Sequence, residues 1–219
     1  MRRAWGLTAL ALGTALAATG CEPTTPVRDC AGCIYDFADT TPPDTLVFHW
    51  PASRMPVRFY ADPRGAMPAL VSLSMAAWQA QFLYGEFRGV QATDSTRADI
   101  IVQWEAGVPP DVTPDPGAPV AACDGATTNP TAVFTDSSAN VLHVTLSPRG
   151  GAFTDAQVAA CLRRVVIHEV GHALGLLKHS PFPLDIMNPT PTVTLPSSVD
   201  RRTVEVLYHT PASVVPPPR

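Results

Sequence analysis

Two histidines and a glutamate in the C-terminal third of the chain have the spacing of a metal site. In His168-Glu169-Val170-Gly171-His172 the two imidazoles are four residues apart. Residues four apart lie on one face of a helix, so both rings can reach one cation. Zinc is the natural ion, because it accepts imidazole nitrogen and acidifies its bound water. Glu169 can take a proton from that water on the open side of the metal.

The helix that must carry these residues has a recognisable beginning. Thr154 and Gln157 match a capping box, in which the threonine hydroxyl accepts from a helical amide while the glutamine reaches back. A broad apolar surface then continues to the histidines and consists of Ala159, Leu162, Val165, Val166, Val170, Ala173 and Leu174. Burial disfavours ionisable groups that lack a partner, so chance is a poor explanation of this cluster. We predict a buried, metal-binding helix that begins after Thr154.

The residues after His172 resemble a known zinc signature. The segment from His168 to Ser180 reads HEVGHALGLLKHS and is similar to the long signature of the metzincins, most closely that of the matrixin branch. In that pattern a glycine ends the helix and the chain swings back to supply a third histidine. Gly175 can supply this helix-ending turn, because a residue without Cβ tolerates the left-handed conformation.

The position of the third ligand departs from the family pattern by one residue. Lys178 stands where the third histidine is usual, and His179 comes next. A protonated lysine has no lone pair to offer a metal, so we take His179 as the ligand, with one extra residue in the turn. The alternative is a site of two histidines whose third ligand is Asp185 or Glu205.

Two further segments resemble the matrixins. Asp185-Ile186-Met187-Asn188-Pro189 looks like the family's Met-turn, and Met187 follows His179 by the usual interval. A last helix, opened by Leu195–Asp200 and continuing through Leu207 and Tyr208, resembles the C-terminal helix of the family. The resemblance is specific over residues 154–209 and architectural over 50–150. It implies an α+β metzincin-like catalytic domain: a twisted mixed sheet with an edge strand over the cleft, an active-site helix, the Met-turn and a C-terminal helix.

The resemblance also implies an activity. A zinc-dependent endopeptidase would hydrolyse peptide bonds of extracellular or envelope proteins through a zinc-bound water activated by Glu169, which then passes the proton to the leaving amine. An extended protein or peptide substrate would lie antiparallel to an edge strand, for which Val141–Leu146 is the candidate. His143 in that strand is expected to face solvent. Calcium, present in many matrixins, is a second candidate cofactor. The competing functions are a zinc-containing surface lipoprotein that binds without cleaving, and a zinc peptidase with another third ligand.

The rest of the domain shows simpler patterns. Alternating or apolar runs predict strands over Met55–Tyr60, Arg97–Trp104 and Asn140–Leu146, and helical spacing predicts a helix over Pro68–Phe82. Residues 105–132 contain six prolines and are predicted to be a long surface loop.

The N-terminus has the pattern of an export signal. Residues 1–20 combine two arginines with an uncharged apolar run and predict a signal peptide. The small residues before Cys21 resemble the lipobox of bacterial lipoproteins, so we expect lipidation there and a membrane anchor. Residues 21–45 are predicted to be a tether, 46–210 the catalytic domain and 211–219 a disordered tail. The protein is then expected to be a lipoprotein at the cell envelope, or secreted.

Export changes how the other cysteines are interpreted. In an oxidising compartment the four that remain predict two disulfides. The simplest pairing is Cys30–Cys33 and Cys123–Cys161, although three connectivities are compatible with the sequence.

Composition bounds the remaining possibilities. The 219 residues carry a formal net charge of −4, and 46% of them are hydrophobic. This length and composition suit one globular domain, which we expect to be a monomer. The scattered basic residues form no stripe for phosphates, so a nucleic-acid partner is excluded.

Overall fold

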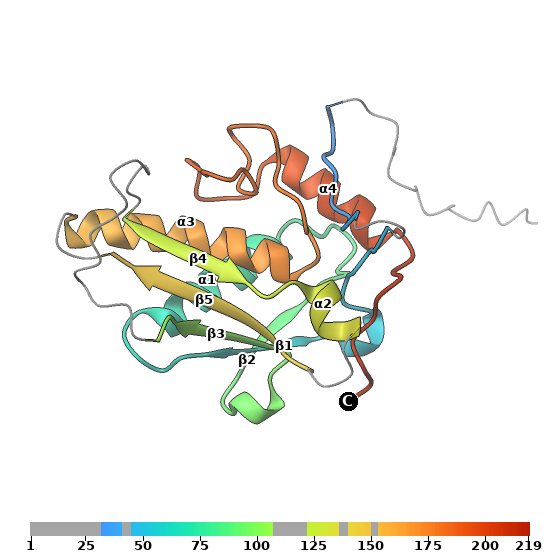
Figure 1. Cartoon of the computed structure of the whole chain (residues 1–219), viewed down its shortest axis with the longest axis horizontal. Coiled ribbons are helices and arrows are strands. Elements are labelled where there is room, and N and C mark those ends of the chain that lie inside the picture. The colour runs from blue at the N-terminus through green and yellow to red at the C-terminus, as the bar shows by residue number, and fades with distance from the viewer. Residues whose placement is uncertain (1–31, 41–44, 107–121, 136–139, 150–152) are drawn as a thin grey trace, which may run out of the picture.

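A five-stranded mixed sheet with two helices packed along it forms the centre of the molecule (Figure 1). The structure is a computed structural model and describes residues 32–40, 45–106, 122–135, 140–149 and 153–219. The strands are β1 (Val57–Ala61), β2 (Gly89–Ala92), β3 (Ile100–Trp104), β4 (Cys123–Thr127) and β5 (Leu142–Pro148). Their order is β2-β1-β3-β5-β4, with β4 antiparallel to β5 and every other pair parallel. The α+β class expected from the sequence is therefore correct.

Helices cover the sheet and close the domain. They are α1 (Met67–Gln79), α2 (Pro130–Thr135), α3 (Asp155–Ala173) and α4 (Ser198–Tyr208), together with single 3₁₀ turns at Ala52–Arg54 and Ser95–Arg97. Helix α3 packs along β4 and β5, α1 packs along β1, β2 and β3, and the two helices contact each other. No helix among the described residues has the length and apolar character needed to cross a membrane.

The core lies between the sheet and these two helices. Alternation along β1 turns Val57, Phe59 and Ala61 inward, as the pleat of a half-buried strand requires. The largest fully buried side chains come from every layer: Trp50, Trp78, Phe48, Phe59, Phe87, Met67, Ile100, Leu142, Leu146, Ile167, Leu174 and Leu176. This packing holds α3 rigidly over the sheet, and α3 carries the candidate metal ligands.

The edge strand expected from the sequence is wrong. Val141–Leu146 falls largely within β5, which lies between β3 and β4 and is therefore an interior strand. The sheet has its two edges at β2 and β4, and the one beside α3 is β4, which lies inside the segment predicted to be a loop over residues 105–132. Its sequence, Cys-Asp-Gly-Ala-Thr, has a central glycine and a single β-branched residue, so local propensity does not mark it as a strand. Ladder bonds to β5 and contacts with α3 form it instead.

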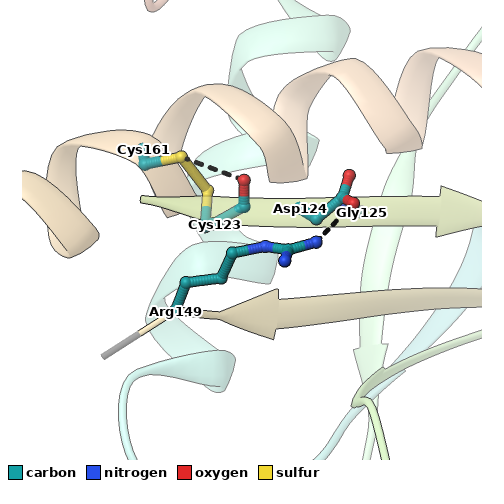
Figure 2. The surroundings of a disulfide bond; sticks show 5 residues. All are labelled: Cys123, Asp124, Gly125, Arg149 and Cys161. Atoms are coloured by element: carbon teal, nitrogen blue, oxygen red, sulfur yellow. Dashed lines mark hydrogen bonds and ion pairs between the residues drawn. A yellow bond between two sulfur atoms is a disulfide. The ribbon is translucent and has the colours of Figure 1, made fainter. Parts of the chain in front are cut away.

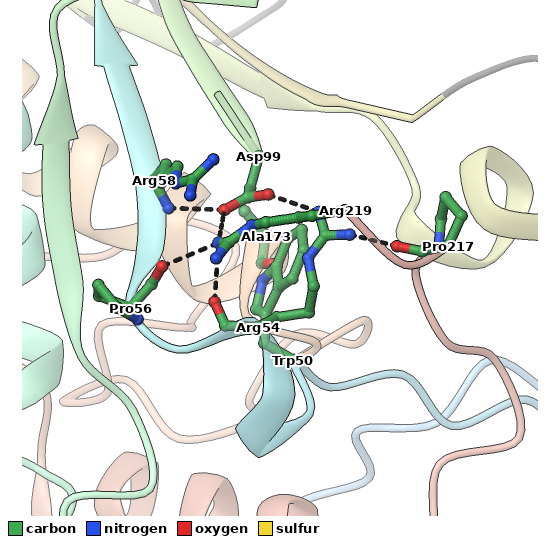
Figure 3. Close-up of polar contacts among 8 residues, drawn as sticks. All are labelled: Trp50, Arg54, Pro56, Arg58, Asp99, Ala173, Pro217 and Arg219. Atoms are coloured by element: carbon green, nitrogen blue, oxygen red, sulfur yellow. Dashed lines mark hydrogen bonds and ion pairs between the residues drawn. The ribbon is translucent and has the colours of Figure 1, made fainter. Parts of the chain in front are cut away.

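The C-terminal residues are packed, in contrast to the disordered tail expected over 211–219. Val214 is 5% exposed and forms a parallel bridge with Phe48. The Arg219 side chain donates to Asp99 Oδ2 at 2.6 Å and to the carbonyl oxygens of Arg54 and Pro56 at 2.8 and 2.9 Å (Figure 3). Sequence composition missed this docking because it depends on one buried carboxylate 120 residues away.

The described part of the expected tether is also packed. Tyr35 is 5% exposed, and its hydroxyl donates to Asp200 Oδ1 of α4 at 3.0 Å. Residues 32–40 therefore belong to the domain. The expected signal peptide over residues 1–20 and the expected lipidation site, Cys21, lie outside the described residues.

Candidate metal centre and active site

Three imidazoles meet at the C-terminal end of α3. Ring nitrogens of His168, His172 and His179 all lie within 4.8 Å of one another. The ring centroids are 4.8 Å apart for His168 and His172, 5.2 Å for His168 and His179, and 5.0 Å for His172 and His179. His168 is buried, His172 half-buried and His179 exposed, so the cluster opens to solvent on one side. The structure brings together the three histidines that the sequence suggested.

Backbone carbonyls fix the tautomer of two of these rings. Nδ1 of His168 donates to the Ile186 carbonyl at 2.7 Å, and Nδ1 of His172 donates to the Leu176 carbonyl at 2.5 Å. A carbonyl oxygen can only accept, so each ring carries its proton on Nδ1 and a lone pair on Nε2. The two Nε2 atoms face each other at 3.1 Å.

That separation fits a metal ion. Two lone pairs at 3.1 Å repel each other unless a cation lies between them. Two nitrogen ligands of a tetrahedral zinc ion, with bonds of about 2.0–2.1 Å, are roughly 3.3 Å apart. The donor set of three neutral imidazoles is one that zinc prefers, so the residues present fit this ion.

Burial keeps the rings in the form that binds metal. Desolvation lowers the pKa of His168 to about 4 and that of His172 to about 3, and it also lowers the pKa of His179. Charge repulsion between neighbouring rings acts in the same direction at His168 and His172. All three imidazoles are therefore neutral near pH 7 and available as ligands.

A tight turn at Gly175 returns the chain toward the cluster. Gly175 has a φ of +112°, and the N–H of Leu176 donates to the Gly171 carbonyl at 3.1 Å across the end of the helix. A Cβ at Gly175 would lie 2.0 Å from the Phe48 carbonyl oxygen, so only glycine fits. The extra residue, Lys178, is accommodated in this turn while His179 reaches the other two rings.

The alternative third ligands are not part of the cluster. The Asp185 carboxylate accepts hydrogen bonds from the hydroxyls of Ser180 at 2.5 Å and Ser197 at 2.6 Å, so both of its oxygens have partners. Glu205 lies on α4. Within the described part of the chain, neither belongs to a group of side chains close enough to hold one ion together with the histidines.

Met187 packs against the backbone of α3 between the two helical histidines. The N–H of Asn188 donates to the Asp185 carbonyl at 3.2 Å, which closes a tight turn within the Met-turn expected over 185–189. Met187 is fully buried, and a Cβ at Gly171 would lie 2.4 Å from its sulfur. The absence of a side chain at Gly171 is thus what allows the Met-turn to approach the helix so closely.

Glu169 is directed at the edge strand. It is 6% exposed, and its Oε2 accepts a hydrogen bond from the Thr127 hydroxyl at 2.7 Å. Burial raises the pKa of Glu169 to about 7, while the hydrogen bond from Thr127 acts in the opposite direction. A carboxyl group that titrates near neutrality, next to a cluster of candidate metal ligands, is suited to accept and return a proton.

A disulfide joins the edge strand to the active-site helix. Cys123 of β4 and Cys161 of α3 are bonded, with their Cα atoms 5.7 Å apart (Figure 2). Nearby, Arg149 and Asp124 form a partly exposed ion pair at 3.1 Å. This disulfide is the pairing suggested by the sequence. The second suggested pair, Cys30–Cys33, includes a residue outside the described part of the chain.

Sequence reasoning missed two residues beside Glu169. Thr127 and Gly125 fall in the segment predicted to be a loop, so neither was connected with the site. A signal was present nevertheless: if Cys123 is bonded to Cys161 and the chain then runs extended along the helix, position 127 comes opposite Glu169. His143, in contrast, is half-buried on β5 and does not belong to the cluster of histidines.

Comparison with known proteins agrees with this geometry. A family model described as matrixin, of the M10 peptidases, matches residues 63–209, about two thirds of the chain. The matched region contains all three histidines, Glu169 and Met187. No curated protein sequence matches the chain significantly.

Proposed function

The chain belongs to the matrixin family of zinc metalloendopeptidases, and we propose that His168, His172 and His179 hold its zinc while Glu169 acts as general base. The observation that carries this assignment is the convergence of three neutral imidazoles within 4.8 Å. Glu169 precedes His172 by less than one helical turn and has a pKa raised to about 7 by burial. These are the residue types and protonation states that hydrolysis assisted by zinc requires.

The proposed mechanism assigns one role to each side chain. When bound, zinc supplies Lewis-acid activation of the attacking water and of the scissile carbonyl. Glu169 accepts the proton of the attacking water and later delivers it to the leaving amine. His168 and His172 keep their Nδ1 protons on backbone carbonyls, so their Nε2 atoms remain unprotonated through the cycle.

The outer edge of β4 is the proposed binding site for the substrate backbone. Two residues that flank β4 mark the side of the strand that faces β5: the Ala122 carbonyl accepts from the N–H of Arg149, just after β5, and the Thr128 N–H donates to the His143 carbonyl of β5. Alternation therefore turns the main-chain groups of Cys123, Gly125 and Thr127 away from β5. An extended peptide can add to this edge by main-chain hydrogen bonds that are independent of substrate sequence. Being a peptidase, the protein acts on proteins or peptides; that these are extracellular or envelope proteins is part of the proposal.

The proposed location is outside the cytoplasm. We propose export by residues 1–20, anchoring through a lipid on Cys21, and a position at the cell envelope, with secretion as the alternative. The Cys123–Cys161 disulfide supports this location, because such bonds persist in oxidising compartments. Calcium binding and a monomeric state remain predictions.

The test of catalysis compares the wild-type protein with Glu169→Gln. We expect one zinc per chain in both proteins by elemental analysis, and cleavage of casein or a peptide library by the wild type alone. A zinc chelator should stop cleavage, and added zinc should restore it. Full zinc occupancy with no cleavage by the wild type would instead identify a binding protein that does not hydrolyse peptides.

The test of the third ligand compares His179→Ala with His143→Ala. His143 lies outside the cluster of histidines and is the matched control. We expect His179→Ala to weaken zinc binding by at least tenfold and His143→Ala to leave it unchanged. Equal zinc affinity in wild type and His179→Ala would place the third ligand elsewhere in the chain.

A further inference from the structure

The edge strand and the active-site helix are matched residue by residue. Cys123 is bonded to Cys161, and a Cβ at Gly125 would lie 2.4 Å from Val165 Cγ1. The Thr127 hydroxyl is bonded to Glu169. Alternate residues of the strand thus meet every fourth residue of the helix. The match arises because two residues of a strand span about 6.7 Å while four residues of a helix span about 6.0 Å.

The last contact in this series is polar, and it involves both the carboxylate and the backbone carbonyl of Glu169. Thr127 Oγ1 is 2.7 Å from the carboxylate oxygen Oε2 of Glu169 and 2.9 Å from the backbone carbonyl oxygen of Glu169. Both partners accept and a hydroxyl has one proton, so Thr127 donates to one of them at a time. Its oxygen nevertheless stays within reach of both, which ties the carboxylate to its own backbone.

The backbone of Gly125 packs against the side chain of Glu169. A Cβ at this position would lie 2.7 Å from Glu169 Cγ and 3.0 Å from Oε1. The side chain of Glu169 therefore runs past the bare backbone of Gly125 and ends at the Thr127 hydroxyl. Because Glu169 is 6% exposed, water has little access to replace a lost hydrogen bond at this position.

We propose that Thr127 is a positioning residue, whose hydroxyl holds the Glu169 carboxylate in the orientation from which it exchanges its proton. This inference rests on the proposed role of Glu169 as general base. The terminal torsion of a glutamate is broad, so without an anchor the carboxylate samples orientations that do not face the attacking water. The main chain of Thr127 is proposed to serve the substrate separately, so a change confined to its side chain should affect turnover and spare binding.

The test compares two substitutions at one position. Thr127→Val keeps the shape and removes the hydroxyl, whereas Thr127→Ser keeps the hydroxyl. We expect Thr127→Val to lower kcat by about 10- to 100-fold, as misplacement of a reacting group does, with KM within about twofold of the wild type. Thr127→Ser should stay within about threefold of wild-type kcat. Thr128→Val is the matched control, because the Thr128 hydroxyl bonds to the His143 carbonyl and not to Glu169.

A second measurement does not depend on cleavage. In the zinc-free protein, Thr127→Val, Glu169→Ala and the double variant form a thermodynamic cycle for the shift in Tm. We expect the double variant to melt no more than about a degree below the lower single variant, because one hydrogen bond is lost in all three.

The proposal would be overturned by wild-type kcat in Thr127→Val, by equal loss of kcat in Thr127→Val and Thr127→Ser, or by additive Tm shifts. A raised KM at unchanged kcat would also overturn it, since it would assign Thr127 to substrate binding. Failure of the proposed function has a different signature, namely full activity in Glu169→Gln or no cleavage by the wild type.

Discussion

Asp200 is connected to His168 through the backbone of a single residue. Asp200 Oδ2 accepts a hydrogen bond from the N–H of Ile186 at 2.8 Å, and the Ile186 carbonyl accepts one from His168 Nδ1 at 2.7 Å. The same carboxylate accepts from the N–H of Ser197 and from the hydroxyl of Tyr35. Burial raises the pKa of Asp200, and these hydrogen bonds act in the opposite direction, so the ionised carboxylate depends on its donors. The first turn of α4 thereby fixes both the Met-turn and a proposed metal ligand.

Asp200→Ala should consequently weaken both folding and metal binding. Loss of the carboxylate leaves buried N–H groups without an acceptor, and we expect about 3 kcal/mol less stability in denaturant unfolding. A freed His168 ring should lower zinc affinity by about 10- to 100-fold in a chelator competition assay. Arg201→Ala, at the exposed neighbouring position, is the control. Unchanged zinc affinity in a destabilised Asp200→Ala would reduce Asp200 to a helix cap.

Gly175→Ala should be far more damaging than Gly85→Ala. Both glycines have positive φ, at +112° and +72°, but a Cβ at Gly85 meets nothing within 4 Å while one at Gly175 lies 2.0 Å from a backbone oxygen. The conformational cost alone is about 1–2 kcal/mol, so Gly85→Ala should lose that much in denaturant unfolding. Gly175→Ala should lose at least twice as much, together with zinc affinity. Equal losses would mean that the Phe48 segment moves aside at little cost.

Local sequence was enough to predict the parts of the site that lie on one element. The capping box at Thr154, the spacing of His168 and His172, and the glycine turn at Gly175 all depend on neighbours within a few residues. The choice of His179 over Lys178 required only that a ligand have a lone pair.

Contacts between distant segments could not be predicted in this way. β4 has weak strand propensity and exists because β5 and α3 bind it, so both the edge strand and Thr127 were missed. The C-terminal residues have a composition typical of disorder, yet Arg219 finds a buried carboxylate that only the folded chain creates. Each failure concerns an element whose stability comes from a partner far away in the sequence.

The buried carboxylate of Asp99 forms ion pairs with two arginines that differ in burial. Arg54 Nη2 bonds Oδ1 at 2.5 Å with a side chain 8% exposed, and Arg219 bonds Oδ2 at 2.6 Å with a side chain 27% exposed (Figure 3). Arg54 also lies over the Trp50 ring, at 5.7 Å. Removing the more buried partner costs more, so Arg54→Ala should lose about 3 kcal/mol and Arg219→Ala about 1 kcal/mol in denaturant unfolding. The reverse order would show that the ion pair of Asp99 with Arg219 stabilises the domain more than the buried pair with Arg54.

Removal of the Cys123–Cys161 disulfide should destabilise the domain through the unfolded state. The bond closes a loop of 38 residues, for which the chain-entropy relation gives about 4 kcal/mol. We expect Cys123→Ala/Cys161→Ala to lose stability of that order in denaturant unfolding. The disulfide is the first of the contacts that align β4 with α3. The variant should therefore lose a larger fraction of its kcat than of its bound zinc. Loss of zinc in proportion to activity would point to general unfolding instead.

Acid should destabilise the zinc-free protein well above the pH at which carboxylates titrate. The pKa of His168 falls from 6.5 to about 4 on folding, and that of His172 falls from 6.5 to about 3. Between pH 6.5 and 5 the unfolded chain therefore binds protons at these rings that the folded chain does not bind. Stability is therefore present above pH 6.5 and is lost as the pH falls, by about 1.4 kcal/mol per pH unit for each proton of difference. His179, whose pKa is also lowered, acts in the same direction.

Glu169 opposes this loss, because its pKa is raised on folding from 4.5 to about 7 and the folded state takes up its proton first. One opposing carboxyl against three imidazoles leaves the net effect destabilising. In zinc-free Glu169→Gln the opposition disappears, so Tm should fall more steeply between pH 7 and 5 than in the wild type, whereas His172→Gln should flatten the profile. A wild-type Tm that stays level over this range would show that the folded protein protonates these rings as readily as the unfolded chain does.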